Sequence, residues 1–382
     1  MRVLWLPVLT LVTLAGLTVS AGGWGQGRGQ QSVTDPFVGV TTNGTAVSGL
    51  FPIRASGVKT DAVRTAADKF LAALTPEQRG RTSYPVDDAE WRKWNNVHRY
   101  ERQGVSFKEM TPDQRERGFD LMRAGLSAKG FTKSRNIMKL NGYVAEVRNN
   151  FDEYGEFLYH LTVMGTPSAK EPWGWQLDGH HLIVNYFVLG DQVVMTPAFF
   201  GSEPVSAETG QYAGTRVFDD EQNLGLAFMQ SLTPAQRQQA TIQTSKTANN
   251  ALSQAFRDNL VLDYAGLRVS DLSAPQRDKL VALIGEYVGA MDNGHAKVRM
   301  DEVKAQLDRT YFGWIGESGP ESVFYYRIHS PVILIEFDHQ TPVALQGPRV
   351  PGRQHIHAVV RTPNGNDYGK DLLRQHHQKF PH

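Results

Sequence analysis

The sequence predicts an α+β fold made of two similar halves, in each of which helices precede a β-rich stretch. Two observations predict this fold. A helix-start motif occurs in two pairs, and each pair leads into segments rich in β-branched and aromatic residues. Helices grouped before strands favour an α+β fold over alternating βαβ units. The 382 residues suffice for two domains, so an internal duplication is an open interpretation.

The first 21 residues have the features of an export signal. Arg2 gives a short positive region, Val3–Val19 is largely apolar, and Val19-Ser20-Ala21 is a small-residue cleavage site. We therefore expect a secreted or periplasmic protein whose mature chain begins at Gly22. The apolar run is shorter than the roughly 20 residues that span a bilayer, and no later run is longer. No transmembrane segment is expected after signal cleavage, and the alternative interpretation of the apolar run is a retained N-terminal anchor.

The polar, glycine-rich composition that follows predicts a flexible leader over residues 22–59, with folded structure from about Thr60. The motif pairs divide the remainder into a first half, residues 60–215, and a second half, residues 216–382. The second half carries the histidine-rich C-terminal region.

Composition excludes several classes of function. The chain has no cysteine, which excludes disulfides, thiolate nucleophiles and thiolate metal sites. Its formal net charge is +1, which gives no support for a nucleic-acid partner. An exported chain without disulfides must be stabilised by its core.

The helix-start motif combines a Ser or Thr N-cap, a Pro in the first turn and a Gln that completes a capping box. A preceding Leu or Met is placed as a hydrophobic staple. The copies are Leu74-Thr-Pro-Glu-Gln-Arg79, Met110-Thr-Pro-Asp-Gln-Arg115, Leu232-Thr-Pro-Ala-Gln-Arg237 and Leu272-Ser-Ala-Pro-Gln-Arg277. Apolar spacing also predicts helices over Val63–Leu74 and Leu280–Met291, the latter ended by Asp292-Asn-Gly294, and a short helix over Asp371–His377.

Six segments are typical of strands because of their β-branched and aromatic content. They are Tyr143–Val147, Glu156–Met164, His180–Met195, Val323–Ile328, Val332–Phe337 and His355–Arg361. The halves also echo each other in sequence. Phe157–Leu161 resembles Phe324–Ile328, and Trp175–Asp178 resembles Ile335–Asp338.

Histidines are the main candidates for chemistry, since imidazole is a common ligand for transition metals. His355 and His357 stand at i and i+2 of a predicted strand, so their side chains share one face. The competing interpretation is two half-exposed sheet histidines that bond only to their neighbours. This spacing is common in copper, zinc and iron sites built on sheets, and zinc or copper is the cofactor that we expect.

His180 and His181 are the second candidate pair. Neighbours on a regular strand point to opposite faces, so only one should face a given site unless a turn at Gly179 re-aims them. His339 is a candidate third ligand, and Asp338 could orient an imidazole instead. If the two halves are related by duplication, Asp178-Gly-His180 and Asp338-His339 occupy equivalent positions of two related sheets and can converge on one site.

Other polar and aromatic residues near these motifs are candidates for catalysis or binding. Asp178 and Glu336 are candidate general bases, and Tyr368 is a candidate catalytic or pocket residue. Trp173, Trp175 and Arg361 are candidates for ligand binding, although the tryptophans are equally explained as core residues.

Signatures of well-known enzyme classes are absent. The sequence has no Gly-x-Ser-x-Gly elbow, phosphate-binding loop, dinucleotide fingerprint or His-Glu-x-x-His helix. The hydrolase and nucleotide-enzyme classes with strong local signatures are therefore disfavoured. On the basis of the candidate histidine ligands, we expect a metal-dependent enzyme, hydrolytic or of a copper redox type, acting on a small molecule or peptide. The alternatives are a non-catalytic envelope protein that binds a ligand or metal, and a structural exported protein whose histidines are incidental.

Three motifs together resemble a known family. They are Trp173-Gly-Trp-Gln-Leu-Asp-Gly-His-His181, His355-Ile-His357 and Arg361-Thr-Pro-Asn-Gly-Asn-Asp-Tyr-Gly369. They resemble a family of bacterial exported proteins known only as a domain of unknown function, over residues 60–377. The resemblance implies that the chain acts as one functional unit, and it brings no activity, metal or substrate.

Overall fold

The computed structural model describes residues 32–380, so the predicted signal peptide lies outside the described residues, as does the start of the leader. The helices are α1 (Asp61–Ala73), α2 (Pro76–Thr82), α3 (Pro112–Gly125), α4 (Ala128–Arg148), α5 (Asp219–Gln230), α6 (Pro234–Ala240), α7 (Ala274–Val288), α8 (Asn293–Ala305) and α9 (Lys370–Lys379). The strands are β1 (Ser83–Tyr84), β2 (Val105–Ser106), β3 (Tyr159–Met164), β4 (Trp173–Gly179), β5 (Leu182–Leu189), β6 (Gln192–Val194), β7 (Ala198–Ser202), β8 (Thr241–Gln243), β9 (Leu267–Arg268), β10 (Tyr311–Gly316), β11 (Phe324–His329), β12 (Leu334–His339) and β13 (Ile356–Arg361). The predicted α+β class is confirmed.

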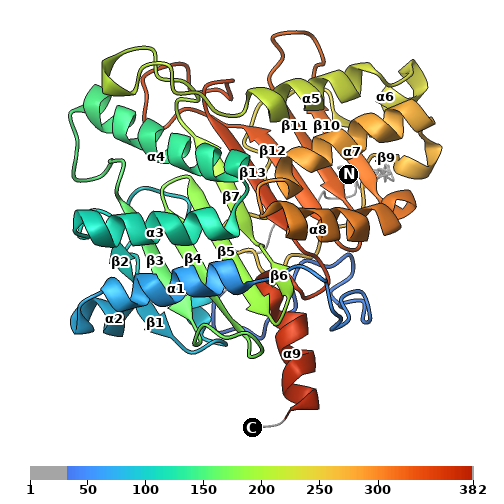
Figure 1. Ribbon diagram of the computed structural model, residues 1–382. Helices are drawn as coiled ribbons and strands as arrows, with labels where there is room; N and C mark the ends of the chain where they lie inside the picture. The colour runs from blue at the N-terminus through green and yellow to red at the C-terminus, as the bar shows by residue number, and fades with distance from the viewer. Residues whose placement is uncertain (1–31, 381–382) are drawn as a thin grey trace, which may run out of the picture.

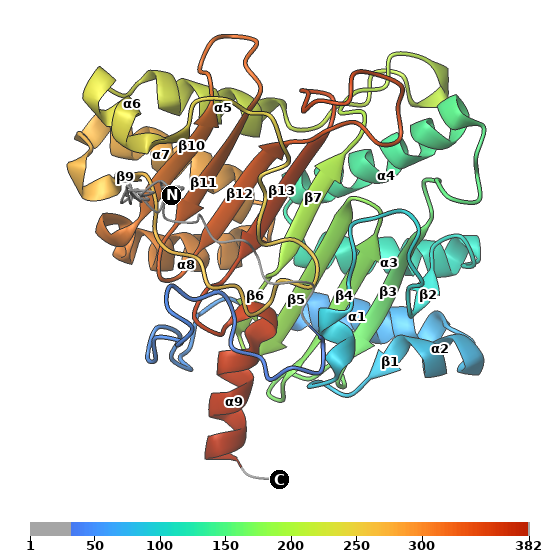
Figure 2. The same cartoon turned by 180° about the vertical axis from the view of Figure 1, so that it is seen from behind.

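Helices α1–α8 lie over one face of a single 13-stranded mixed sheet (Figure 1). The reverse view shows the other face crossed by long loops, with residues 32–59 near one end of the strands (Figure 2). Side chains alternate between these faces along each strand, so Ile356 and Ala358 of β13 join the main core under the helices. Val359 instead packs with Phe199 in a smaller cluster under the loops.

All four predicted capping boxes are confirmed. They begin α2, α3, α6 and α7, each with proline in the first turn. The two members of each pair also touch. Gln78 and Gln114 exchange amide hydrogen bonds, as do Gln236 and Gln276. The motif therefore joins neighbouring helix starts as well as capping each helix.

The strand order has the same pattern from both edges of the sheet. It runs β1-β3-β4-β5-β7 from one edge and β8-β10-β11-β12-β13 from the other, and β7 pairs antiparallel with β13 at the centre. β1 and β8 each add a parallel neighbour to β3 and β10, and β2 and β9 each add an antiparallel one. The helix-then-sheet order predicted for each half is present in one continuous sheet.

Glycines at matching places in the two halves have the same constraint. Gly104 precedes β2 with φ +85°, and a Cβ there would lie 2.2 Å from the carbonyl oxygen of Leu161. Gly266 precedes β9 with φ +94°, and its Cβ would lie 2.0 Å from the carbonyl oxygen of Phe312. Both positions therefore exclude any larger residue, because of conformation and of space.

Three local predictions are corrected. Tyr143–Val147 lies inside α4 and not in a strand, because its buried Val144 and Ala145 continue the apolar face of a 21-residue helix. Asp292 does not end a helix: its carboxylate accepts from the N–H groups of Gly294 and His295 as the N-cap of α8. The two echoed segments do not occupy matching strands. Phe157–Leu161 belongs with β3, the second strand from one edge of the sheet, whereas Phe324–Ile328 belongs with β11, the third strand from the other edge.

The described part of the predicted leader, residues 32–59, packs against the folded chain. Val40 is fully buried, and Thr41 exchanges main-chain hydrogen bonds with Leu260 and Leu262. None of the helices within residues 32–380 is both long and apolar enough to cross a bilayer.

Candidate metal centre

Three histidines converge at one end of the central strands, on the face covered by loops. The Nε2 atom of His355 lies 3.0 Å from that of His357 and 3.3 Å from that of His181, and the third separation is 3.2 Å. All three side chains are buried. Within the described chain, these residues form a group whose ligand atoms all lie within 4.8 Å of one another.

Two elements bring these imidazoles together. His357 lies on β13 opposite Gly201 of β7, and His355 immediately precedes β13 on the same side. His181 occupies the turn between β4 and β5 with φ +63°, a conformation uncommon for a non-glycine residue. The turn re-aims His181 away from the regular alternation and over the central strands, where its N–H donates to Asn96 and its carbonyl accepts from Gly201.

The protonation of these rings suits a cation at their centre. The Nδ1–H of His355 donates to the carbonyl oxygen of Thr341 at 2.8 Å, so the Nε2 of this neutral ring carries a lone pair. Burial lowers the pKa of His355, and it lowers the pKa of His181 and of His357 well below the ordinary value. The rings are therefore neutral at pH 7, and a metal ion can use a lone pair from each.

The spacing fits tetrahedral zinc. With Zn–N distances of about 2.0–2.1 Å, tetrahedral ligands are separated by about 3.3–3.4 Å, close to the three observed separations. No carboxylate or fourth imidazole within the described residues joins the group. Three protein ligands with a remaining open position are typical of catalytic sites, whereas structural zinc sites are closed by four.

Glu203 orients the ring of His355 from the side that faces away from the three Nε2 atoms. Its Oε2 lies 3.3 Å from the Nδ1 of His355, and its two oxygens accept from the N–H groups of Val343, Ala344 and Leu345. One buried carboxylate thus fixes both an imidazole and the loop that supplies Thr341. Carboxylates in this position hold the tautomer and ring orientation of metal-binding histidines.

His180 lies beside the cluster without joining it. Its ring stacks on His181 with centroids 3.9 Å apart, and its Nδ1–H donates to the Asn141 side chain. Burial lowers the pKa of His180 well below its usual value. His98 meets His180 edge-on, stacks on Tyr154 and lies near Glu153, with 20% of its side chain exposed. This stack of rings reaches from the cluster toward solvent.

His339 is separate from the cluster. Its Nδ1 accepts from the N–H of Phe324, and its Nε2 bonds to the Gln222 side chain from α5. It faces the helices, whereas the three convergent histidines face the loops. Asp338 does lie across from His357 in the sheet register, but its carboxylate binds Lys246 and the N–H groups of Asn250 and Ala251.

The two candidate general bases differ in their surroundings. Asp178 lies on β4, three residues before His181, and accepts from Arg102 and the N–H of Asn95 through one oxygen. Burial raises its pKa to about 6, opposed by Arg102. Glu336 uses both oxygens, which accept from the Tyr325 hydroxyl, the Ser253 hydroxyl and the N–H groups of Leu252 and Ser253.

The remaining candidate residues lie in buried packing. Trp173 and Trp175 are fully buried in the main core under the helices. The Arg361 guanidinium donates to Asp258 and Asp367, and the Tyr368 hydroxyl also donates to Asp258. These bonds attach the loop around Asp258 to the end of β13.

Sequence reasoning missed Glu203, Thr341 and His98. Glu203 lies 152 positions before His355 in a segment without a recognised motif, and Thr341 contributes only a main-chain carbonyl. His98 stands alone in a stretch that contains no second histidine nearby. No sequence signal marks any of the three, because each acts through a contact between distant segments.

Comparison with known proteins identifies the family. The family model described as protein of unknown function (DUF3500) matches residues 56–370. No curated protein and no solved structure matches the chain. This match spans both halves of the sheet and all three convergent histidines, and it confirms the expected resemblance to a family of unknown function. The chain belongs to the DUF3500 family.

Proposed function

We propose that this protein is a metal-dependent enzyme whose metal is held by His181, His355 and His357. The observation that carries the proposal is the convergence of three neutral imidazole nitrogens at tetrahedral spacing with no fourth protein ligand in the described chain. An open coordination position accepts water or substrate.

Zinc and copper are the two candidate metals, because imidazole suits both. Zinc would lower the pKa of a bound water and support hydrolysis of a small molecule or peptide. Copper would support redox chemistry on an organic substrate. The chain's own contribution is the same in either case: Glu203 and Thr341 hold His355 as the Nδ1–H tautomer, and the buried surroundings keep all three rings neutral.

Asp178 is the better candidate general base of the two carboxylates. Its pKa of about 6 lies near neutral pH, which suits proton transfer, and only one of its oxygens accepts hydrogen bonds from described residues. Glu336 is occupied by four donors from two loop residues and one tyrosine. The bonds of Tyr368 and Arg361 to Asp258 likewise favour a structural role for these two residues.

Metal analysis of untagged protein tests the proposal. The purified protein is stripped of metal, repleted with zinc or copper, desalted and analysed by mass spectrometry. We expect about one metal per chain in the wild type and none in His355→Ala/His357→Ala. His339→Ala is the matched control, because it removes a buried histidine outside the cluster, and it should bind as the wild type does. A metal content near zero after repletion, or the same content in the double variant, would sink the proposal.

A non-catalytic protein that binds a ligand or metal is the second candidate. The burial of the cluster favours it, since the three side chains are at most 6% exposed. It predicts tight metal binding and a raised melting temperature without turnover of any substrate. Product formation that requires the metal would exclude it.

We also propose export to the periplasm or the medium, on the basis of the N-terminal signal sequence. N-terminal sequencing of protein recovered from fractionated cells should give a mature chain that starts at Gly22. A chain that retains Met1 in the cytoplasmic fraction would contradict this.

We further infer that the two halves arose by duplication. The matching strand order, the paired capping boxes and the equivalent glycines Gly104 and Gly266 support this inference. The histidines themselves are not repeated: the turn between β11 and β12, which matches the turn of His181, contains no histidine, and neither does β7, which matches β13. A search for sequence similarity between residues 60–215 and 216–382 across many family members would test it: alignment at other registers, or none, would contradict it.

A further inference from the structure

A cavity lies at the opposite end of the central strands from the histidines. It is enclosed between α7 and α8, the starts of β6 and β7, and the end of β13, and its volume is about 50 Å³. Thr362 lines it, five residues beyond His357. At about 3.3 Å per residue of strand, the two sites are about 17 Å apart along β13.

The interior of this cavity is apolar and adaptable. Met195, Met291, Ile333, Val360 and Leu372 contribute to its wall. Methionine side chains adjust to the shape of a bound group because they are unbranched and flexible. Since one water needs about 10–15 Å³ of such volume, the cavity takes about three to five water-sized groups.

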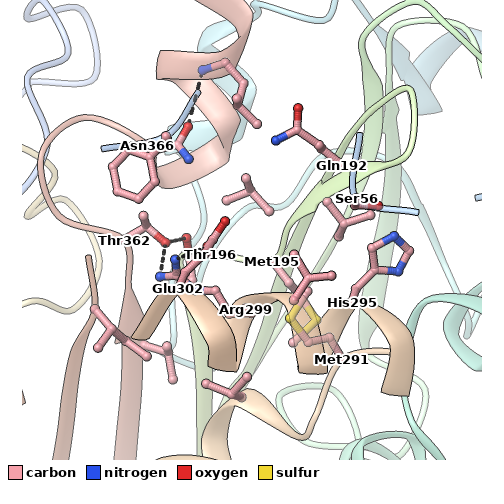
Figure 3. Close-up of a pocket in the computed structure, with 18 of the residues that line it drawn as sticks. Ser56, Gln192, Met195, Thr196, Met291, His295, Arg299, Glu302, Thr362 and Asn366 are labelled. Atoms are coloured by element: carbon pink, nitrogen blue, oxygen red, sulfur yellow. Dashed lines mark hydrogen bonds and ion pairs between the residues drawn. The ribbon is translucent and has the colours of Figure 1, made fainter. Parts of the chain in front are cut away.

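One wall of the cavity carries an arginine with unused donors. Figure 3 shows Arg299 beside Glu302, with Thr362 joined to Arg299 and to Thr196 by hydrogen bonds. The guanidinium donates to Thr362, Glu302 and the carbonyl oxygen of Val332. Its Nε–H and one Nη1 hydrogen have no acceptor among residues 32–380, so they are available to a ligand.

Among the arginines and carboxylates that line the cavity itself, positive charge is in excess. Glu302 is shared, since its Oε2 lies 3.0 Å from Arg299 and its Oε1 lies 3.3 Å from Arg54, which also lines the cavity. Two guanidinium groups thus face one carboxylate. An anion that bonds to Arg299 would balance this excess charge, and carboxylate matches the planar donor pattern of arginine.

Residues 51–58, called the strap, cover the cavity. Every described hydrogen bond between the strap and the rest of the protein involves a side chain. Gln192 bonds to the N–H of Arg54 and the carbonyl of Pro52, and Asp191 accepts from the N–H groups of Ser56 and Gly57. Within the described chain, the strap makes no main-chain to main-chain hydrogen bond. It can therefore lift without breaking any strand or helix, which gives a ligand a route of entry.

We propose that this cavity binds a short aliphatic carboxylate, with the carboxylate on Arg299 and the alkyl chain among the methionines. The available volume sets the alkyl chain at about three to five carbon atoms, counted without the carboxylate at the Arg299 wall. The site is independent of the histidine centre, because it lies on the other face of the sheet and shares no lining residue with it.

Calorimetric titration of the full chain with butyrate tests the proposal, with butanol and butylamine as probes of the same length. We expect butyrate to bind and the other two to bind at least about tenfold more weakly, because they lack the charge-assisted bond. Arg299→Gln should weaken butyrate about tenfold and leave butanol unchanged. Val298→Phe places a ring into the cavity from α8 and should abolish binding of both.

Two controls separate this site from other effects. Arg309→Gln removes an exposed arginine beyond the end of α8 and should bind butyrate as the wild type does. His355→Ala/His357→Ala should also keep butyrate binding, which distinguishes failure here from failure of the metal proposal. Absence of butyrate binding, equal binding of butylamine, or full binding by Val298→Phe would each overturn the proposal.

Discussion

Replacing Glu203 by glutamine separates metal positioning from loop anchoring. The carboxylate accepts from three consecutive N–H groups, at 2.7 Å from Leu345 and 3.0 Å from Ala344, with Val343 shared between both oxygens. Glutamine keeps one oxygen, and its NH₂ group meets an N–H or the Nδ1–H of His355 at the other position. Loss of one charge-assisted bond, together with an unsatisfied buried donor, should reduce the free energy of unfolding by about 2–4 kcal/mol.

The same change should weaken zinc binding. Loss of a carboxylate that lies beside a metal-binding histidine and orients it reduces metal affinity by about 10–100-fold, or about 1.4–2.7 kcal/mol. Competition with a chromophoric chelator measures the affinity, and urea unfolding of the metal-free protein measures the stability. Glu208→Gln is the control, because Glu208 is exposed five residues further along the chain.

The two measurements distinguish the roles. If Glu203→Gln loses stability but binds zinc with wild-type affinity, the carboxylate only anchors the loop and the reasoning about His355 is wrong. If neither quantity changes, the buried hydrogen bonds described here do not contribute as argued. Glu208→Gln should leave both quantities unchanged.

Three further predictions concern the stability of the folded protein. Gly104→Ala and Gly266→Ala should each cost about 1–3 kcal/mol from the positive φ, plus the clash of Cβ with a carbonyl oxygen. Urea unfolding equal to that of the wild type would refute the constraint argued for these positions. Burial lowers the pKa of His329 to about 3, so its protonation in the unfolded state should remove about 2 kcal/mol of stability as pH falls from 8 to 5. His329→Phe should lack that part of the pH dependence, and an unchanged pH profile would contradict the argument. Arg361→Met leaves the buried Asp367 without its ion-pair partner and leaves Asp258 paired with Arg92 alone. The change should cost about 3–5 kcal/mol by chemical denaturation, whereas a loss under 1 kcal/mol would show that Asp367 and Arg361 are not charged partners.

The predictable part of the fold rests on local chemistry. A capping box needs only a Thr or Ser and a Gln three residues later, so the starts of α2, α3, α6 and α7 follow from the sequence alone. The pairing of His355 and His357 follows in the same way from the period of a strand. Tyr143–Val147 was wrong as a strand because the β-propensity of five residues is weaker than the burial pattern of a long helix.

The rest of the site depends on contacts between distant segments. His181 joins the cluster through a positive φ that no glycine at that position signals, and Glu203 acts through main-chain donors of residues 343–345. His339 stands one residue past Asp338 and therefore points to the opposite face. The same alternation that pairs His355 with His357 excludes His339 from the cluster.

The central pairing of β7 with β13 has a consequence for the order of assembly. Ser202 and Ile356 are partners across this seam although 154 residues separate them, so the seam closes only after a large loop has been ordered. His181 belongs to the polypeptide before that loop, and the other two imidazoles belong to the polypeptide after it. A chain still emerging from synthesis or translocation therefore has no site to load, and metal capture reports that the two ends have met.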